Sequence, residues 1–172
     1  MRLATEDSHA PNDSMTRTQA DDLPWTTQNS PMGKYGVQRQ SLSQAAGGQK
    51  DIGVWGGGHP FDLEIHRVAP GKVNFPLHEH TAQWEAYYIL SGSGKVRTSQ
   101  GKEAIKAGDY LVFPPGEAHQ ILNTGSEDLT YMVIADQPLA DVIHYPDSGK
   151  WFVKPQKKVF EMNEVDYFKG EE

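Results

Sequence analysis

Three histidines and one glutamate have the residue types and the spacing to bind a divalent metal ion. His78 and His80 are two positions apart, and such positions in a strand point to the same face. Glu85 follows five positions later, so it reaches the same point only if the chain bends between His80 and Glu85. His119 comes from a distant segment, after a Pro-Pro-Gly turn. Imidazole and carboxylate donors form a borderline ligand set that suits Mn, Fe, Co, Ni, Cu or Zn.

The elements that must position these side chains have a β-rich pattern. Residues 61–136 contain no segment of 3.6-residue periodicity longer than two turns. They consist of short runs of β-forming residues separated by Gly, Pro and Ser, at 61–68, 84–90, 95–98, 110–113, 119–122 and 129–135. Many short strands joined by tight turns predict an all-β sandwich, jelly roll or small barrel. Apolar runs at 142–143, 151–153 and 159–160 predict further strands or an extended wrap.

The chain divides into three parts by composition. Residues 1–22 are polar and acidic, and we expect a disordered or flexible tail. Residues 23–58 carry spaced apolar anchors such as Trp25, which predicts an extended arm packing on the barrel. Residues 59–172 are expected to form the barrel domain with a C-terminal wrap. Because the arm is long for a loop, we expect it to add strands at a barrel edge, its own or a neighbour's, and predict a homodimer.

Charge and cysteine content exclude several classes of function. The 172 residues include 16 Lys and Arg and 23 Asp and Glu, for a formal charge of −7, which argues against nucleic-acid binding. Cysteine is absent, so disulfides, thiolate zinc sites and cysteine nucleophiles are excluded. No apolar run approaches the roughly 20 residues of a membrane helix, and the polar N-terminus lacks the apolar core of a signal peptide. We therefore expect a cytoplasmic protein that binds no membrane.

Two sequence segments resemble the conserved motifs of the cupin superfamily. Residues 71–92, GKVNFPLHEHTAQWEAYYILSG, follow the first motif: Gly, His-x-His, four residues, Glu, six residues, Gly. One residue more than usual separates Gly71 from His78. Residues 108–123, GDYLVFPPGEAHQILN, match the second motif position for position. The 15 residues between the motifs equal the spacing of compact microbial cupins, so the resemblance spans about a third of the chain.

This resemblance implies a fold, a set of metal ligands and a pocket. The fold is a cupin-type antiparallel jelly-roll barrel, and the ligands are His78, His80, Glu85 and His119. If Glu85 points inward, strand alternation brings Tyr87 inward too. Tyr87 is then a candidate catalytic residue that bonds the substrate or carries a proton, although a core tyrosine is the alternative. Glu85 can serve as a catalytic base if it loosens from the metal.

Three functions remain open from the sequence. The favoured one is a metal-dependent enzyme that acts on a small molecule with oxygenase-type chemistry, because four protein ligands on an octahedral ion leave two positions free. The second is a sugar or sugar-phosphate isomerase, which a weaker resemblance over 23–35 and 145–150 suggests. It needs a second base and, for a phosphate, a cation, for which Arg67, Lys72 and Lys95 are the candidates. The third is a non-catalytic metal or small-molecule binding module. Alternation places either His66 or Arg67 inward without deciding between them.

Overall fold

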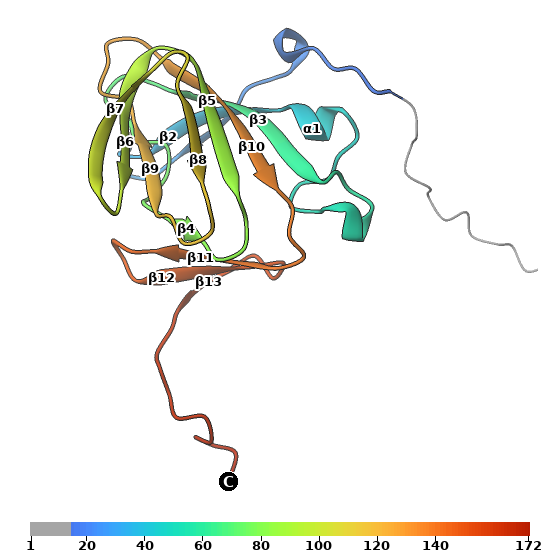
Figure 1. The fold of residues 1–172 in the computed structure, drawn as a ribbon, viewed down its shortest axis with the longest axis vertical. Coiled ribbons are helices and arrows are strands. Elements are labelled where there is room, and N and C mark those ends of the chain that lie inside the picture. Colours follow the sequence, from blue (N-terminus) through green and yellow to red (C-terminus); the bar gives the residue numbers. More distant parts are fainter. Residues whose placement is uncertain (1–14) are drawn as a thin grey trace, which may run out of the picture.

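Three antiparallel sheets form the barrel in the computed structural model, which describes residues 15–172 (Figure 1). The elements in chain order are η1 Ala20–Asp22, β1 Thr26–Asn29, β2 Gly36–Ser41, α1 Leu42–Ala45, η2 Val54–Gly56, β3 Phe61–Val68, β4 Glu79–His80, β5 Glu85–Ser91, β6 Ser93–Thr98, β7 Gly101–Lys106, β8 Tyr110–Phe113, β9 His119–Leu122, β10 Leu129–Asp136, β11 Asp141–Tyr145, β12 Lys150–Lys154 and β13 Lys158–Glu161. This confirms the all-β jelly-roll expectation.

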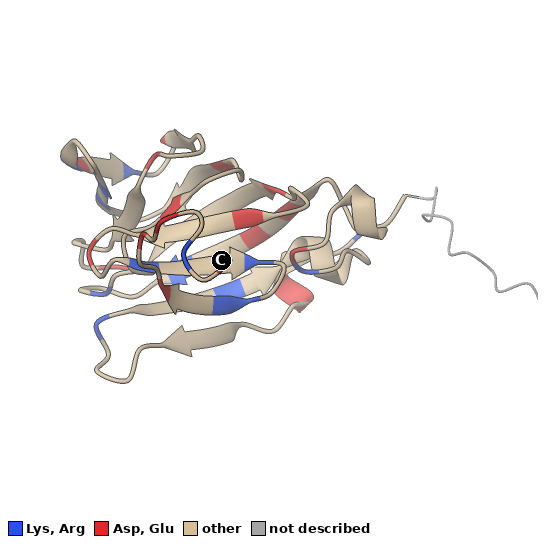
Figure 2. Ribbon diagram, turned by 90° about the horizontal axis from the view of Figure 1, so that it is seen from below, with Lys and Arg blue, Asp and Glu red and all other residues tan. Residues whose placement is uncertain are grey.

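The strand order places distant segments side by side. One sheet has the order β1-β2-β3-β10-β5-β8, a second the order β7-β6-β9, and a third the order β13-β12-β11-β4. In Figure 1 the third sheet lies across the lower end of the barrel. Figure 2, seen from that end, shows basic and acidic residues interspersed on the strands.

The core follows from the two-residue periodicity of the strands. Along β10, Leu129, Tyr131, Val133 and Ala135 are buried, and the residues between them are at least partly exposed. On β5, buried Tyr87 alternates with half-exposed Tyr88. Each strand therefore turns one face into the barrel and the other toward solvent.

The predicted strands lie close to the observed ones. The runs at 61–68, 110–113 and 119–122 coincide with β3, β8 and β9, and β7 was not predicted. The four motif glycines at strand ends, Gly71, Gly92, Gly108 and Gly116, all have positive φ. Gly92 also lies so close to the Asp128 carbonyl that a Cβ atom would be only 2.4 Å from its oxygen, which leaves no room for a side chain.

The arm packs on its own chain. β1 pairs with β2, and β2 pairs with β3, so this segment extends the largest sheet. The Arg67 guanidinium lies 3.9 Å above the Trp25 ring, which fixes the start of the arm against β3. The three-part domain division stays a prediction, and residues 1–14 of its tail lie outside the described residues. Among residues 15–172, no helix is both long and apolar enough to cross a membrane.

Candidate metal centre

The four motif side chains come from three different sheets. His80 ends β4, Glu85 begins β5 and His119 begins β9, while His78 lies just before β4 and is bridged to His119. The chain bends over residues 81–82, between His80 and Glu85. That bend turns Glu85 toward the histidines, as its odd offset requires.

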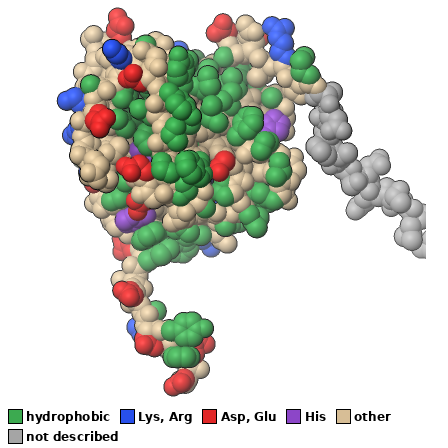
Figure 3. All heavy atoms as spheres, in the orientation of Figure 1, with side chains coloured by type: hydrophobic (Ala, Val, Ile, Leu, Met, Phe, Trp, Pro, Cys, Tyr) green, Lys and Arg blue, Asp and Glu red, His purple; other side chains and the backbone are tan. Residues whose placement is uncertain are grey.

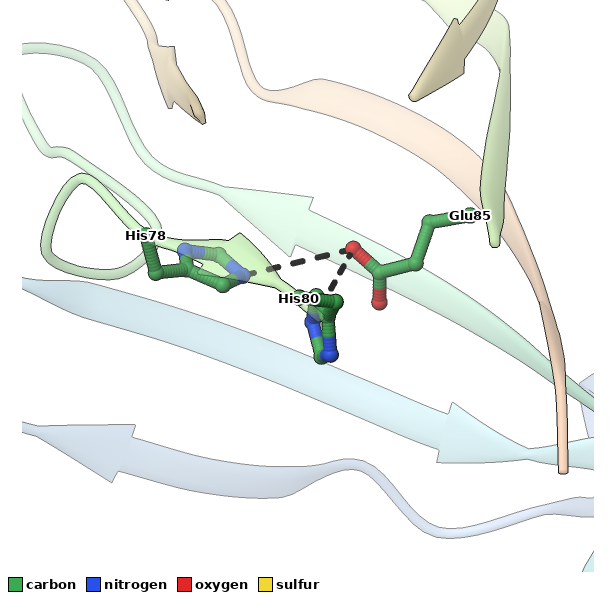
Figure 4. Close-up of side chains that lie close together, drawn as sticks. All are labelled: His78, His80 and Glu85. Atoms are coloured by element: carbon green, nitrogen blue, oxygen red, sulfur yellow. Dashed lines mark ion pairs between the residues drawn. The ribbon is translucent and has the colours of Figure 1, made fainter. Parts of the chain in front are cut away.

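The side chains converge on one oxygen of Glu85. Its Oε2 atom lies 2.8 Å from His119 Nε2, 3.7 Å from His80 Nε2 and 4.0 Å from His78 Nε2. Figure 4 shows His78 and His80 directed at the carboxylate from the opposite side. Donor atoms of His78, His80 and Glu85 all lie within 4.8 Å of one another, a grouping that suits a metal ion, and His119 joins it through its contact with Glu85.

Outward hydrogen bonds fix the orientation of all three imidazoles. Nδ1 of His78 lies 2.9 Å from the Pro76 carbonyl, and Nδ1 of His119 lies 3.0 Å from the Glu117 carbonyl. A carbonyl oxygen only accepts, so both Nδ1 atoms carry the hydrogen and donate it. With Nδ1 donating outward, Nε2 of each ring faces Glu85, which is the arrangement of a metal-binding histidine.

The protonation states favour a cation at this point. Burial, together with the neighbouring histidines, lowers the pKa of His78 to about 3, so its ring is neutral near pH 7. Burial alone would raise the pKa of Glu85, but the hydrogen bond from His119 and the three histidine charges outweigh it and hold that pKa well below its usual range. The lone pair of the neutral His78 Nε2 and the Glu85 carboxylate oxygen therefore face each other, 4.0 Å apart, with no proton between them. Two acceptors so placed are satisfied by a cation.

The spacing of the donor atoms also fits a transition metal. Two donors at right angles, each about 2.1 Å from one ion, are about 3 Å apart. The separation between His119 Nε2 and Glu85 Oε2 is close to that value, and the two longer separations need only small side-chain rotations. The residues present thus fit a divalent ion.

Tyr87 points into the same cluster. Its hydroxyl donates to Glu85 Oε2 at 3.0 Å and lies 3.2 Å from His119 Nε2. The side chain is buried, and burial together with the charge of Glu85 raises its pKa. The hydroxyl therefore keeps its proton and can donate it in a hydrogen bond, either to Glu85 or to a ligand.

No sequence pattern pointed to Asp141, which holds His80. Its Oδ2 atom accepts from His80 Nδ1 at 2.6 Å, and its Oδ1 atom accepts from the Ala82 amide at 2.9 Å. Asp141 begins β11, and its side chain is 1% exposed. A histidine that donates to a buried carboxylate has a fixed ring orientation and a more basic second nitrogen.

A cavity of about 460 Å³ opens beside the cluster. His78, His80 and Glu85 line it together with the cations Arg39, Lys50, Lys150 and Lys154. None of the three cations named from the sequence, Arg67, Lys72 and Lys95, is among the cavity residues. The ammonium group of Lys154 contacts Asp51 at 3.2 Å and Gln83 at 3.3 Å.

The structure also decides which residue of β3 faces inward. His66 is buried and lines the cavity, whereas Arg67 faces Trp25 on the other side of the sheet. His66 Nε2 lies 2.7 Å from Glu64 Oε2, and Glu64 also lines the cavity. Neither Glu64 nor Arg39, at 3.9 Å from it, was singled out from the sequence.

Comparison with known proteins gives a consistent result. The family model of the cupin domain matches residues 64–135. The chain is 30% identical over 136 residues to auxin-binding protein 1 of Arabidopsis thaliana, which covers 72% of this chain and 62% of that protein. It is 38% identical over 68 residues to the oxalate-binding protein of Thermotoga maritima, which covers 40% of this chain and 55% of that protein. The chain thus spans less than two thirds of the length of these relatives.

A solved structure matches more of the chain. A sugar phosphate isomerase from a cupin superfamily in Silicibacter pomeroyi superposes with a TM-score of 0.69 at 20% identity, over 84% of this chain and 90% of that one. At this identity the likeness shows the fold. The jelly-roll barrel and the His, His, Glu cluster define a cupin-type candidate metal site, and the family model agrees. Residues 64–135 therefore carry a cupin domain.

Proposed function

We propose that this protein is a metal-dependent cupin enzyme in which His78, His80, Glu85 and His119 bind one divalent transition metal. The observation that carries the proposal is the convergence of three imidazole Nε2 atoms on one buried carboxylate oxygen, while their Nδ1 atoms donate outward. A structural histidine cluster would not need three Nε2 atoms aimed at one carboxylate oxygen. The ion is Fe, Mn, Ni, Zn, Co or Cu.

The favoured chemistry is an oxygenase-type reaction on a small molecule. A bound redox-active ion would supply open positions for a chelating substrate and dioxygen. The residues that line the cavity would hold the substrate beside the ion. Tyr87 donates a hydrogen bond to Glu85 or to the substrate, and Glu85 can take a proton if it loosens from the ion.

An isomerase-like reaction on a sugar or sugar phosphate is the second candidate. The cations on the cavity wall favour it, because an anionic substrate needs a positive partner away from the metal. Among them, Arg39 offers a guanidinium that can bind a carboxylate or phosphate with two hydrogen bonds. The solved cupin from Silicibacter pomeroyi carries the name of such an enzyme. A binding module without turnover is the remaining alternative.

The first experiment measures metal content by elemental mass spectrometry. The full chain, without a tag, is purified with neither a nickel column nor a chelator, and compared with His119→Ala and His144→Ala. His144 is the matched control, since it stacks on Trp151 and bonds Glu79 outside the cluster. We expect near-stoichiometric metal in the wild type and His144→Ala, and loss in His119→Ala. A wild type that holds no metal even after reconstitution would refute the proposal.

The identity of the ion and a turnover screen then separate the candidates. Fe, Mn, Ni or Cu together with dioxygen consumption in the presence of chelating substrates supports the oxygenase. Zn at full occupancy, without dioxygen consumption, favours the isomerase or the binding module, and turnover of sugars or sugar phosphates decides between those two.

A further inference from the structure

His66 and Glu64 form a second polar pair in the cavity, away from the metal cluster. His66 Nε2 lies 2.7 Å from Glu64 Oε2, and both residues line the cavity that the metal ligands also line. His66 Nδ1 is buried and has no hydrogen-bond partner among the described residues. Buried polar atoms are nearly always paired, so an unpaired ring nitrogen on a residue that lines the cavity needs an explanation.

The pair fixes where the imidazole proton lies. The hydrogen bond from His66, with help from Lys50 and Arg39, keeps the pKa of Glu64 low against the opposing effect of burial, so Glu64 is ionised. Burial lowers the pKa of His66, so its ring is neutral. A carboxylate only accepts, so Nε2 carries the hydrogen and Nδ1 keeps a lone pair. That lone pair can act as a base, and Glu64 would stabilise the imidazolium that forms.

Strand register gives the distance between the Glu64–His66 pair and the metal cluster, which Tyr87 contacts. Glu64 on β3 and Tyr87 on β5 both align with Val133 on β10, so they are two strand spacings apart, about 10 Å. All three side chains point into the barrel. Arg39 aligns with His66 on the neighbouring strand β2 and faces the same side. One small molecule can therefore reach from the metal cluster to the His66 region.

We propose that Glu64 and His66 form an acid–base pair that acts on the end of a metal-held small molecule remote from the ion. The inference rests on the proposed function for the metal end. The substrate class is a hydroxylated carbonyl or carboxylate compound that extends along the cavity. His66 Nδ1 takes a proton from an O–H or C–H group, the bonding electrons stay on the molecule, and return of the proton restores both partners. No oxidant or reductant is required.

The test uses histidine ring ¹⁵N NMR on the full chain, metal-free and loaded with diamagnetic Zn²⁺. The probes are gluconate, which carries hydroxyls along its length, and glycolate as the short control. We expect a protonated Nε2 and a bare Nδ1 on His66. Gluconate should shift the Nδ1 resonance of the zinc-loaded protein, and glycolate should not.

Variants separate a role in ligand contact from a role in packing. His66→Phe keeps an aromatic ring against Phe75 and Tyr131, and should lower gluconate affinity about tenfold, the effect of one lost hydrogen bond. Zinc content and glycolate affinity should not change. Arg67→Gln, on the outer face of the same strand, is the control and should bind gluconate like the wild type.

Glu64→Gln covers the case in which His66→Phe does not fold. Its amide offers one donor and one acceptor, so it no longer fixes the tautomer, and we expect a mixed ring signal with weaker gluconate binding. A protonated Nδ1 in the wild type overturns the inference, and so does gluconate binding that leaves His66 unmoved or is no tighter than that of glycolate. The tautomer of His66 is also measured on the metal-free protein. A protein that binds no zinc would therefore refute the proposed function, while the tautomer would still test the Glu64–His66 pair.

Discussion

Replacing Asp141 with asparagine tests whether His80 is a metal ligand held by a buried carboxylate. Asp141 accepts from His80 Nδ1 through one oxygen and from the Ala82 amide through the other. Asparagine has the same shape, but only one of its two terminal atoms accepts. Asp141→Asn therefore keeps one of these bonds at most and removes the negative charge behind His80.

The structure sets the magnitude of both effects. A hydrogen bond to a charged group contributes about 1.5–3 kcal/mol, so the free energy of unfolding of the metal-free protein should fall by about 2 kcal/mol. Removing a partner that orients a ligand typically weakens metal binding about 10- to 100-fold. Burial would raise the pKa of Asp141, but the hydrogen bond and charge of His80 outweigh it and bring that pKa from 3.8 to about 2. A carboxyl with a lowered pKa stabilises the fold above 3.8, and the benefit, on the order of 2 kcal/mol, is lost as the pH falls toward 2.

Urea unfolding of the metal-free protein and competition with a chelator measure the two quantities. Asp136→Asn is the matched control, because Asp136 accepts from the Trp84 amide at 2.8 Å in the same region without touching a ligand. It should lower stability but leave metal affinity within about twofold of the wild type. If Asp141→Asn binds metal as tightly as Asp136→Asn does, His80 is not a ligand that Asp141 positions, and the reasoning fails.

Three further predictions follow from the same geometry. The pKa of His78 is lowered to about 3, so the folded protein leaves this ring neutral at pH values where the unfolded chain protonates it, below 6.5. The free energy of unfolding of the metal-free protein, measured by urea titration, should therefore fall by up to about 1.4 kcal/mol per pH unit between 6.5 and 3. A flat profile would contradict the buried neutral ring. Tyr87→Phe removes one hydrogen bond to Glu85 and should cost about 1 kcal/mol of unfolding free energy at unchanged metal content, and loss of the metal would show that Tyr87 is needed to hold Glu85. The homodimer stays a prediction, and apolar side chains of β5, β8 and β10 gather on the outer sheet face (Figure 3). If this face forms the dimer, Val112→Lys should give a monomer by light scattering. A monomeric wild type would show that the prediction is wrong.

The sequence was sufficient for the parts of the site that depend on local pattern. Alternation within one strand correctly placed Tyr87 inward, and the odd offset of Glu85 correctly required a bend after His80. The two motif segments then pointed to one fold, which the strand order confirms.

The parts that the sequence did not reveal depend on pairing between distant strands. Asp141 lies 61 residues from His80, and no spacing rule connects them. Alternation on β3 allowed either His66 or Arg67 to face inward, and the choice follows from Trp25, which covers the outer face of that strand. In the sequence Lys154 is one charge in a polar run. It lines the cavity because β11 and β12 lie across the barrel end.

The position of the candidate ligands at the meeting of three sheets links cofactor loading to folding. His80, Glu85 and His119 begin or end β4, β5 and β9, one strand from each sheet, so the coordinating atoms assemble only after the sheets have docked. An ion bound to all of them would stabilise only the fully closed barrel, and a concentration 100 times its dissociation constant would add about 2.7 kcal/mol. Local opening of any one sheet would then release the ion, so metal retention would report the integrity of the whole barrel.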